Sequence, residues 1–592
     1  MVDTSAAPAG VQAGVRAGAE QVESLLAAMT VEEKVGSLLV ARVVTGADGS
    51  LWEGTESESP FGFAPTTELV RARHITHLTL MNAAPAAELA RWGENVRRLA
   101  ASTRLGIPVS VAADPVHGRN RNAQVAMSGG GFTVLPEPIG LAATRDPALV
   151  REAARMIGAE LRAAGIRIAL HPMADLATEP RWGRVAGTFG EDPALAAELV
   201  TEYVAGLQES GVAATVKHFP GGGPQRGGED SHFERGAHTV YPGGRFEDHL
   251  APFAAAVRAG VVRVMPGYAA PIGLDADEVG FAFERRILTD VLRGRLGFDG
   301  VVVTDFNIVS GMRLPRLGIE FPVRAWGMLQ ASPAERVARL FDAGVDQLGG
   351  EDDPAPLLEA LERGLISLER VDVSVRRVLR EKAALGLLDG PGDGAADADR
   401  VARHIATPEH IELARRVQRA SVVALQGGQL RLTAATRVYT EGVDREVLAR
   451  YATPVESLAD ADVAIVRIDA PFEPREGMLE QGFHQGSLEF PPATVERIAA
   501  IAARVPTVVD VFLDRPAVLT PLAALPLTLL GSFGVDDAVL LDIVTGAAPT
   551  SGRLPFDIPR SMAAVEASRE DVPFDTVDPV FGFGHGLVWS SL

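Results

Sequence analysis

The stretch that decides the fold is GFDGVVVTDFN, residues 297–307. Val301–Val303 is a purely apolar, β-branched run, which is typical of a strand buried on both faces of a parallel sheet. Asp305 follows this run directly. An aspartate at such a junction either caps a helix or lies at the carboxyl edge of the sheet, where α/β folds carry their chemistry. Position alone leaves both interpretations open.

On both sides of this strand, between residues 70 and 350, short β-rich runs alternate with amphipathic helical runs. The predicted strands include Ile107–Ala113, Ile166–His171, Ala213–Phe219, Val261–Tyr268, Val301–Phe306 and Val345–Leu348. The predicted helices include Asp146–Ala164, Asp192–Gln208 and Glu247–Ala259. This alternation predicts an α/β protein with an N-terminal (β/α)8 barrel of the TIM type, or a close variant.

A barrel of this kind carries its active site where the strands end. Polar residues of several different types occur at these positions. A barrel edge whose side chains only faced solvent would not need such variety. They are Asp114, Arg184, Lys217, His218, Tyr268 and Asp305.

The chain divides into four predicted parts, since one core rarely exceeds about 300 residues. Residues 1–20 are expected to be a flexible N-terminus, 21–386 the catalytic barrel, and 387–415 a linker rich in Gly, Asp and Pro. Residues 416–592 are expected to form a smaller α/β sandwich domain that contributes to the active site. The strands predicted there are Ser421–Leu425, Val463–Ile468, Thr507–Leu513 and Leu527–Leu530.

The composition excludes several classes of function. The 592 residues carry a net charge of −21, which opposes binding to nucleic acid or anionic lipid. The absence of cysteine excludes disulfides, thiolate nucleophiles and iron–sulfur clusters. No apolar stretch approaches the roughly 20 residues needed to span a bilayer. The sequence leaves a homo-oligomer open.

The N-terminal segment Met1–Gln21 lacks the basic start and continuous apolar core of a secretory signal. We therefore expect a cytoplasmic protein, although a secreted form whose signal has been removed would look the same.

Two adjacent cation-capable residues, Lys217 and His218, end a buried strand and precede Pro220 and Gly221. Neighbouring residues of a strand point to opposite faces, so both can reach one ligand only if the chain kinks there. The proline and glycine make such a kink plausible. A surface basic pair would fit poorly after so apolar a run.

Four barrel motifs together resemble family three of the glycoside hydrolases. They are AADPVHGRN (112–120), TEPRWGRVAGTFGEDP (178–193), KHFPGGG (217–223) and GFDGVVVTDFN (297–307). Near the C-terminus, GAAPTSGRLPFDIP (546–559) and FGFGHGL (581–587) resemble the closing motifs of that family's second domain.

Carried over position by position, the resemblance implies that Asp305 is a catalytic nucleophile. It also implies that Asp114, Arg184, Lys217 and His218 bind the hydroxyls of the terminal sugar, to which their charged groups can form strong hydrogen bonds. Tyr268 matches a position near the nucleophile. Phe306 replaces a tryptophan that is common in the family. Arg181, in the same loop as Arg184, is expected to form a structural ion pair with Glu191 or Asp192 and not to bind the sugar.

A retaining glycosidase needs a second acid about 5 to 5.5 Å from the nucleophile. The resemblance places it in a loop of the second domain, which here is RIDAPFEPREGMLEQGFHQGSLEF (467–490) and carries Asp469, Glu473, Glu476 and Glu480. We favour Glu473, because apolar neighbours such as Phe472 would raise the pKa of its carboxyl group. For each of these four residues, the competing interpretation is a solvent-exposed carboxylate of the loop that has no catalytic role.

The rival for this role is His232. Asp230-Ser231-His232 resembles the loop that supplies a histidine acid/base in the family's N-acetylglucosaminidase branch, and a histidine oriented by an aspartate can transfer protons. We interpret Glu229, Asp230 and His232 as residues that contact the substrate or support those that do.

These features predict a retaining, exo-acting β-glycosidase, with β-glucosidase as the leading choice and neither metal nor organic cofactor required. Its substrate would be a small β-glycoside or an oligosaccharide. The alternatives are a β-xylosidase, a β-N-acetylglucosaminidase that uses the Asp–His pair, and a carbohydrate-binding protein that has lost hydrolysis.

Overall fold

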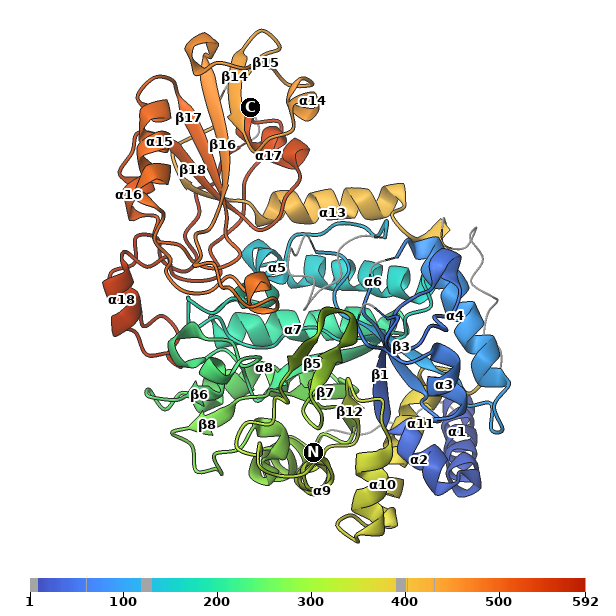
Figure 1. Ribbon diagram of the computed structural model, residues 1–592. Helices are drawn as coiled ribbons and strands as arrows, with labels where there is room; N and C mark the ends of the chain where they lie inside the picture. The colour runs from blue at the N-terminus through green and yellow to red at the C-terminus, as the bar shows by residue number, and fades with distance from the viewer. Residues whose placement is uncertain are drawn as a thin grey trace.

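The structure is a computed structural model that describes the chain except residues 1–8, 60, 83, 119–129, 390–400, 402, 431 and 591–592. It has two layered domains (Figure 1), and the first is built around eight parallel strands. These are β1 (Leu39–Val43), β2 (His77–Leu80), β3 (Ser110–Ala113), β4 (Ile168–Ala169), β5 (Ala213–Phe219), β7 (Arg263–Pro266), β9 (Val301–Val302) and β12 (Leu348–Gly349).

The eight strands form a barrel. Their order is β12-β1-β2-β3-β4-β5-β7-β9, and a parallel bridge between Val303 and Gln347 joins the two outer strands. This arrangement confirms the predicted fold class. β1 and β2 precede the first strand that we named from the sequence, and each is a short apolar run buried at almost every position.

Helices connect successive strands of the barrel and cover its outside. They include α3 (Thr66–Arg71), α4 (Ala86–Ala101), α6 (Pro147–Ala163), α7 (Pro193–Glu209), α8 (Phe246–Arg258), η6 (Arg286–Arg295) and α9 (Pro333–Ala343), and α11 (Leu368–Ala384) follows the last barrel strand. Their starts follow from local sequence. Asp146 and Asp192 each cap a helix whose first residue is proline, whose missing N–H costs nothing at that position. Ser332 and Glu335 form a capping box at α9.

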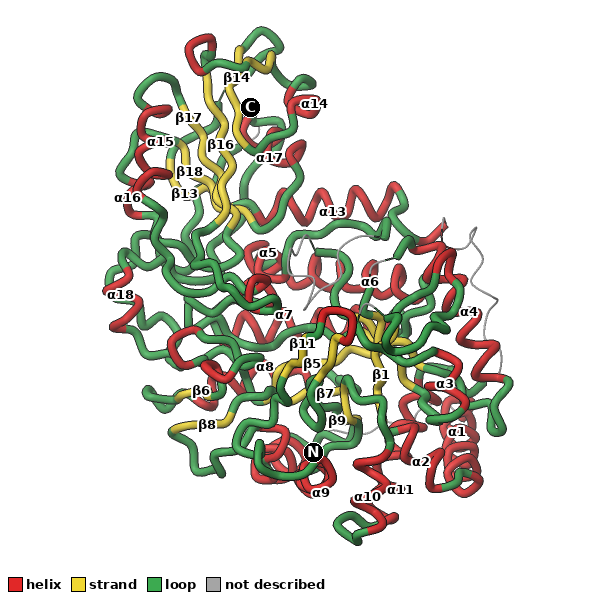
Figure 2. Tube along the Cα trace, viewed as in Figure 1, coloured by secondary structure: helices red, strands yellow, loops and turns green. Residues whose placement is uncertain are grey.

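The second domain is an α/β sandwich. Its strands are β13 (Val423–Gln426), β14 (Arg437–Glu441), β15 (Thr453–Val455), β16 (Val463–Asp469), β17 (Thr507–Phe512) and β18 (Thr528–Ser532). Their order is β13-β18-β17-β16-β14-β15, and β13 is antiparallel to β18 while the other pairs are parallel. Figure 2 shows this sheet apart from the barrel strands.

Alternate residues of these strands enter two separate cores. Ala464 and Val466 of β16 lie in one hydrophobic cluster, and Ile465 lies in the other. The period of two is that of a sheet covered on both faces. α15 (Pro492–Ala502) contributes Ile498 to the first cluster, and α17 (Asp537–Val544) contributes Leu540 to the second.

Two helices cross boundaries that we predicted from composition. α1 (Ala9–Ala28) extends across residue 20, and its residues Val22 and Leu26 join the barrel core. α13 (Pro408–Ser421) begins inside the predicted linker, where Thr407 caps it. Local helix signals therefore extend into segments whose overall composition resembles a linker.

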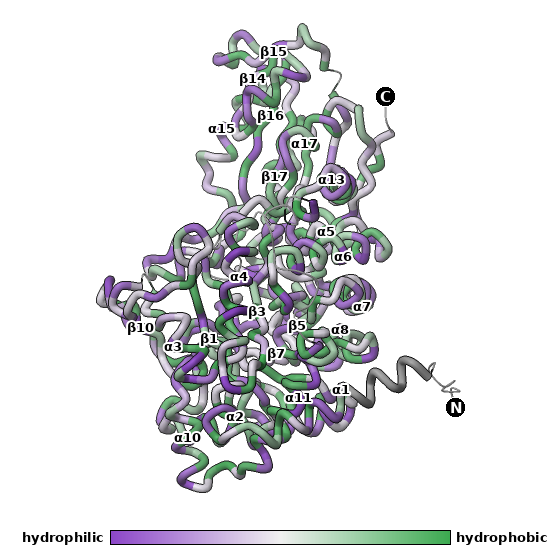
Figure 3. Tube along the Cα trace, turned by 90° about the vertical axis from the view of Figure 1, so that its right-hand side faces the viewer, coloured by the Kyte–Doolittle hydropathy of each residue, from purple (hydrophilic) through white to green (hydrophobic). Residues whose placement is uncertain are grey.

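In the view of Figure 3 the second domain lies at one end of the barrel, with α13 and α5 (Pro138–Thr144) packed together between them. No helix in the described part of the chain is long and apolar enough to cross a membrane.

Candidate active site

Asp305 lies where β9 ends, at the carboxyl edge of the barrel, and is 9% exposed. Its Oδ1 accepts two hydrogen bonds, from the Tyr268 hydroxyl at 2.8 Å and from the Phe306 N–H at 2.8 Å. Its Oδ2 lies 3.7 Å from His218 Nε2. The next α-helix along the chain, α9, is capped by Ser332. The helix-cap interpretation of Asp305 is therefore wrong.

The surroundings of Asp305 keep its carboxyl group ionised. Burial acts to raise its pKa, but electrostatic interactions with His218, His232, Lys217 and Arg184 outweigh burial and lower the pKa below the usual aspartate value. A buried carboxylate held in its charged form, with one oxygen fixed by two hydrogen bonds and the other 3.7 Å from His218 Nε2, is suited to nucleophilic attack.

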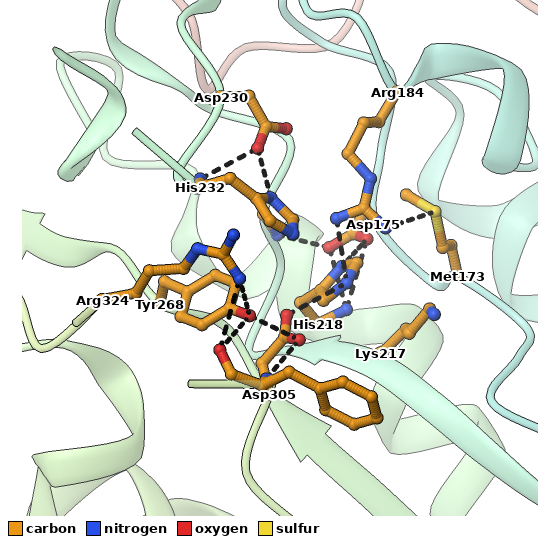
Figure 4. A network of polar contacts seen from close by, with 12 residues as sticks. Met173, Asp175, Arg184, Lys217, His218, Asp230, His232, Tyr268, Asp305 and Arg324 are labelled. Carbon is orange, nitrogen blue, oxygen red and sulfur yellow. Dashed lines mark hydrogen bonds and ion pairs between the residues drawn. The ribbon is translucent and has the colours of Figure 1, made fainter. Parts of the chain in front are cut away.

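Lys217 and His218 at the end of β5 both face this site (Figure 4). The pairing of β5 with β7 shifts register between Lys217 and Phe219, which accompanies the change of direction that we predicted. Lys217 Nζ lies 3.0 Å from Asp114 Oδ1, which follows β3. Asp114 and Lys217, far apart in sequence, therefore form one charged pair at the barrel mouth.

His218 is held by two charged neighbours. Its Nδ1 lies 2.9 Å from Asp175 Oδ2, and Arg184 Nη1 lies 3.1 Å from its Nε2. Since carboxylates accept and guanidinium donates, this network assigns the proton to Nδ1 and makes Nε2 an acceptor. Asp175 was missed by the sequence analysis, and the only available signal was one acid within an otherwise apolar segment.

Tyr268 is buried and connects Asp305 with Arg324. The Tyr268 hydroxyl lies 2.6 Å from the Phe306 carbonyl oxygen and accepts a hydrogen bond from Arg324 Nη1 at 3.3 Å. Burial and the negative charge of Asp305 raise the pKa of Tyr268 well above its usual value, so it stays a donor. Arg324 follows the hairpin of β10 (Met312–Leu314) and β11 (Ile319–Phe321), and nothing in its local sequence marked it.

His232 belongs to the same site. Its ring packs edge-on against Tyr268, with centroids 5.0 Å apart, and its Nδ1 lies 2.6 Å from Asp230 Oδ1. Trp182 donates from Nε1 to the other oxygen of Asp230 at 2.8 Å. Burial lowers the pKa of His232, and Arg324 and Arg184 lower it further, while Asp230 opposes them by raising it.

Glu473 is not brought into this cluster. It lies in the loop after β16, where its backbone pairs with Gln485, and its side chain is exposed. No hydrogen bond or ion pair between described residues links it with Asp305 or with a predicted sugar-binding residue. Phe472 stacks on His484, with ring centroids 3.9 Å apart, and leaves Glu473 open to solvent. The apolar enclosure that we predicted for Glu473 is therefore absent.

The other acids of this loop also lie outside the cluster. Glu476 is exposed, and Glu480 pairs with Arg235 at 3.1 Å. The predicted pairing of Arg181 with Glu191 or Asp192 is wrong, because Arg181 binds Glu179, its near neighbour, at 2.6 Å.

Both domains line a cavity of about 110 Å³ beside the sugar-binding candidates. Arg184 and Lys217 contribute to its wall from the barrel, and His484 and Asp514 contribute from the second domain. Among the described residues, no cluster of histidine and acidic side chains has the geometry to hold a metal ion.

Comparison with known proteins agrees with this architecture. Residues 30–381 match the Glycosyl hydrolase family 3 N terminal domain, and residues 361–589 match the Glycosyl hydrolase family 3 C-terminal domain. The chain is 43% identical over 582 residues to Beta-glucosidase C of Emericella nidulans, covering 96% of this chain and 92% of that protein. It is 35% identical over 595 residues to the periplasmic beta-glucosidase/beta-xylosidase of Dickeya chrysanthemi, covering 96% of this chain and 90% of that protein.

The fold is also that of a solved enzyme. The crystal structure of the beta-glucosidase from Listeria innocua in complex with isofagomine superposes with a TM-score of 0.75 at 22% identity, covering 96% of this chain and 83% of that one. With both family domains matched in order along nearly the whole chain, this protein belongs to glycoside hydrolase family 3 and is a glycoside hydrolase.

Proposed function

We propose that this enzyme is a retaining, exo-acting β-glucosidase with Asp305 as its nucleophile. The observation that carries the proposal is the state of Asp305, a buried carboxylate kept ionised by surrounding cations, with one oxygen fixed and the other facing the site. The names of the relatives from Emericella nidulans and Dickeya chrysanthemi support glucosides as the first substrates to test.

The terminal sugar would be held by the charged groups next to Asp305. A pyranose presents only hydroxyls, and the Asp114–Lys217 pair and the Arg184–His218 pair supply both acceptors and donors for them. Each pair is already assembled in this structure. Because these side chains are already ordered, substrate binding costs less conformational entropy.

In the first step, Asp305 Oδ2 would attack the anomeric carbon while the bond from that carbon to the aglycone oxygen breaks. Tyr268 and the Phe306 N–H hold Oδ1, so that the attacking oxygen has one orientation. The leaving oxygen takes a proton from an acid on the opposite side. Water then attacks the glycosyl-enzyme, and the same acid/base accepts the proton that water loses.

We propose His232 for this proton transfer in place of Glu473. His232 packs against Tyr268, which contacts the nucleophile, whereas Glu473 is exposed. Its Nδ1 is bound to the Asp230 carboxylate, and no hydrogen bond with another described residue involves its Nε2. Nε2 is thus the atom that would give and take the proton, while Asp230 fixes the ring and stabilises the imidazolium.

The His232–Asp230 pair also favours a second substrate class, because the sequence of this loop resembles that of the N-acetylglucosaminidase branch. A panel of p-nitrophenyl glycosides of glucose, xylose, galactose, arabinofuranose and N-acetylglucosamine separates the candidates. We expect the β-glucoside to give the highest kcat/KM. Cleavage of the N-acetylglucosaminide alone would replace β-glucosidase with that activity.

The nucleophile is tested by trapping. A 2-deoxy-2-fluoro-β-glucoside with a good leaving group should inactivate the enzyme by leaving its sugar on the protein, since the fluorine slows hydrolysis of the intermediate. Digestion and peptide mass analysis are expected to place the sugar on Asp305. A label on another residue would refute the assignment.

A further inference from the structure

A loop of the second domain packs directly on the His232–Asp230 pair of the barrel. Phe483 is 2% exposed, and its ring centroid lies 5.3 Å from that of His232 and 5.3 Å from that of Phe233. Gln485 is 1% exposed, and its Oε1 accepts a hydrogen bond from the Asp230 N–H at 3.2 Å. The two members of the pair are therefore each touched by a different residue of the other domain.

The loop that presents Phe483 and Gln485 is held in place by a buried arginine. Arg515 donates from Nη2 to the backbone oxygens of Pro471, Gln485 and Ser487 at 2.7, 3.1 and 3.0 Å. From Nη1 it donates to the oxygen of Arg181 in the barrel at 2.8 Å. One guanidinium thus binds backbone atoms of both domains and fixes how the loop meets the barrel.

The barrel anchors the other side of the pair. Trp182 binds the Asp230 carboxylate, and Trp326 Nε1 donates to the Ser231 oxygen at 2.9 Å. Gly236 closes the loop, where an added Cβ would lie 2.1 Å from the Asp230 oxygen. These contacts leave the Asp230 N–H and one face of the His232 ring to be covered by the second domain.

We propose that Phe483 and Gln485 are positioning residues for proton transfer, through which docking of the second domain fixes the His232–Asp230 pair and keeps water from His232. The inference rests on the proposed role of His232. In this arrangement the second domain acts on catalysis without supplying the acid/base itself. Gln485 acts through Asp230, and Phe483 acts through the imidazole ring.

The two residues should have opposite effects on the proton affinity of His232. The charged and titratable groups facing it are Asp230, Arg184, Arg324, Tyr268 and Asp305. Loss of the Phe483 cover admits water, weakens the burial that lowers the pKa of His232, and so raises that pKa. Displacement of Asp230 after loss of Gln485 removes the group that raises the pKa, and so lowers it.

The experiment is a pH profile of kcat/KM with an alkyl β-glucoside, a poor leaving group that needs the protonated acid. In Phe483→Ala we expect the alkaline limb to move to higher pH, and in Gln485→Leu to lower pH, each by about half a unit or more. We expect kcat to fall about tenfold in both variants, with KM changed by less than about threefold, because the sugar-binding pairs are untouched.

Two matched variants control for general damage. Phe472→Ala removes an aromatic ring of the same loop that stacks on His484 instead of His232, and its profile should match the wild type. Phe483→Leu keeps an apolar cover and should hold the limb near its wild-type position even if Phe483→Ala fails to fold.

The outcomes separate this inference from the function on which it rests. If His232→Ala retains wild-type kcat on the alkyl glucoside, the role of His232 is wrong. Suppose instead that His232→Ala loses activity. If the folded Phe483→Ala and Gln485→Leu variants then leave the alkaline limb of kcat/KM where it is in the wild type, or both move it in the same direction, the positioning role is overturned.

Discussion

The hydroxyl of Tyr268 donates to Asp305 Oδ1 across 2.8 Å, and this contact joins the ends of two different barrel strands. It fixes one oxygen of the carboxylate, while the other, Oδ2, lies 3.7 Å from His218 Nε2. The same hydroxyl receives a hydrogen bond from Arg324, so its position is set from both sides.

Tyr268→Phe should therefore slow catalysis without unfolding the enzyme. A hydrogen bond to a charged group contributes about 1.5 to 3 kcal/mol, which corresponds to a decrease in kcat/KM of about 10- to 150-fold. Steady-state kinetics on p-nitrophenyl β-glucoside measure the loss, and thermal unfolding serves as the control. A variant as active as the wild type would show that Phe306 N–H alone orients Asp305.

Asp305→Asn should lower kcat by about 10⁴-fold or more, because the covalent path is lost with the nucleophile. The amide has nearly the same shape, so the melting temperature should not fall enough to explain the loss. Activity is measured with the aryl glucoside after a stringent check for wild-type contamination. A decrease of less than about tenfold would exclude a nucleophilic role.

His232→Ala should be rescued by azide. Substrates with good leaving groups still glycosylate Asp305, but the intermediate then waits for a water molecule that no base activates. Azide carries no proton to remove, so a β-glycosyl azide should form and the rate should rise with azide concentration. Product analysis by NMR identifies the anomer.

Glu473→Ala is the matched comparison, since Glu473 is exposed and no hydrogen bond or ion pair within the described part of the chain links it with a predicted sugar-binding residue. We expect its turnover to lie within about threefold of the wild type and not to respond to azide. Rescue of Glu473→Ala together with no rescue of His232→Ala would return proton transfer to the second-domain loop.

Asp230→Asn tests the orientation of the imidazole. Asp230 is buried, and pairing with His232 lowers the pKa of its carboxyl despite that burial, so it is ionised throughout the working range. Without this negative charge the pKa of His232 falls, and the alkaline limb of kcat/KM should move to lower pH. We expect kcat to fall by about 10²- to 10⁴-fold, as loss of an orienting aspartate does in other His–Asp pairs. An unmoved limb would show that another group sets it.

Glu351→Gln should stabilise the fold at alkaline pH. Burial raises the pKa of Glu351 to about 7, although the N–H groups of Val309 and Ser310 and the charge of Arg42 oppose the increase. Because its folded pKa exceeds the usual value of 4.5, the folded state holds the proton more tightly, and stability declines as pH rises from 4.5 to 7.

The amide keeps the acceptor, since both N–H groups donate to the same oxygen, Oε1. It cannot ionise. Glu351→Gln should therefore exceed the wild type in unfolding free energy by up to about 3 kcal/mol at pH 8 and differ little at pH 4.5. Urea unfolding at these two pH values measures the difference in unfolding free energy. An equal difference at both pH values would show that ionisation of Glu351 is not its cause.

Much of this protein was predictable from local sequence. Val301–Val303 and the runs like it are apolar and β-branched, and the helices between them have capping residues, as Asp146 and Asp192 illustrate. A parallel sheet with helices between its strands places strand ends on one rim. For that reason the sequence alone predicts that Asp114, Lys217, His218 and Asp305 share one site.

The sequence did not reveal which side chains support these residues. Asp175 and Arg324 bind His218 and Tyr268 across large sequence separations, and their own neighbours give no periodic or motif signal. Such contacts form only once barrel closure and loop packing bring distant segments together.

The different environments of Glu473 and His232 were likewise set by tertiary structure. Apolar neighbours in the sequence suggested a buried Glu473, but Phe472 stacks on His484 and leaves that carboxyl in water. His232 is enclosed by Tyr268 from the barrel and Phe483 from the second domain. The sequence by itself determined the strands, the helices and the rim that carries Asp305, because those depend on local periodicity and local capping. Only the docking of the two domains decided which ionisable side chain is shielded from solvent, because that shielding depends on residues that meet from separate domains.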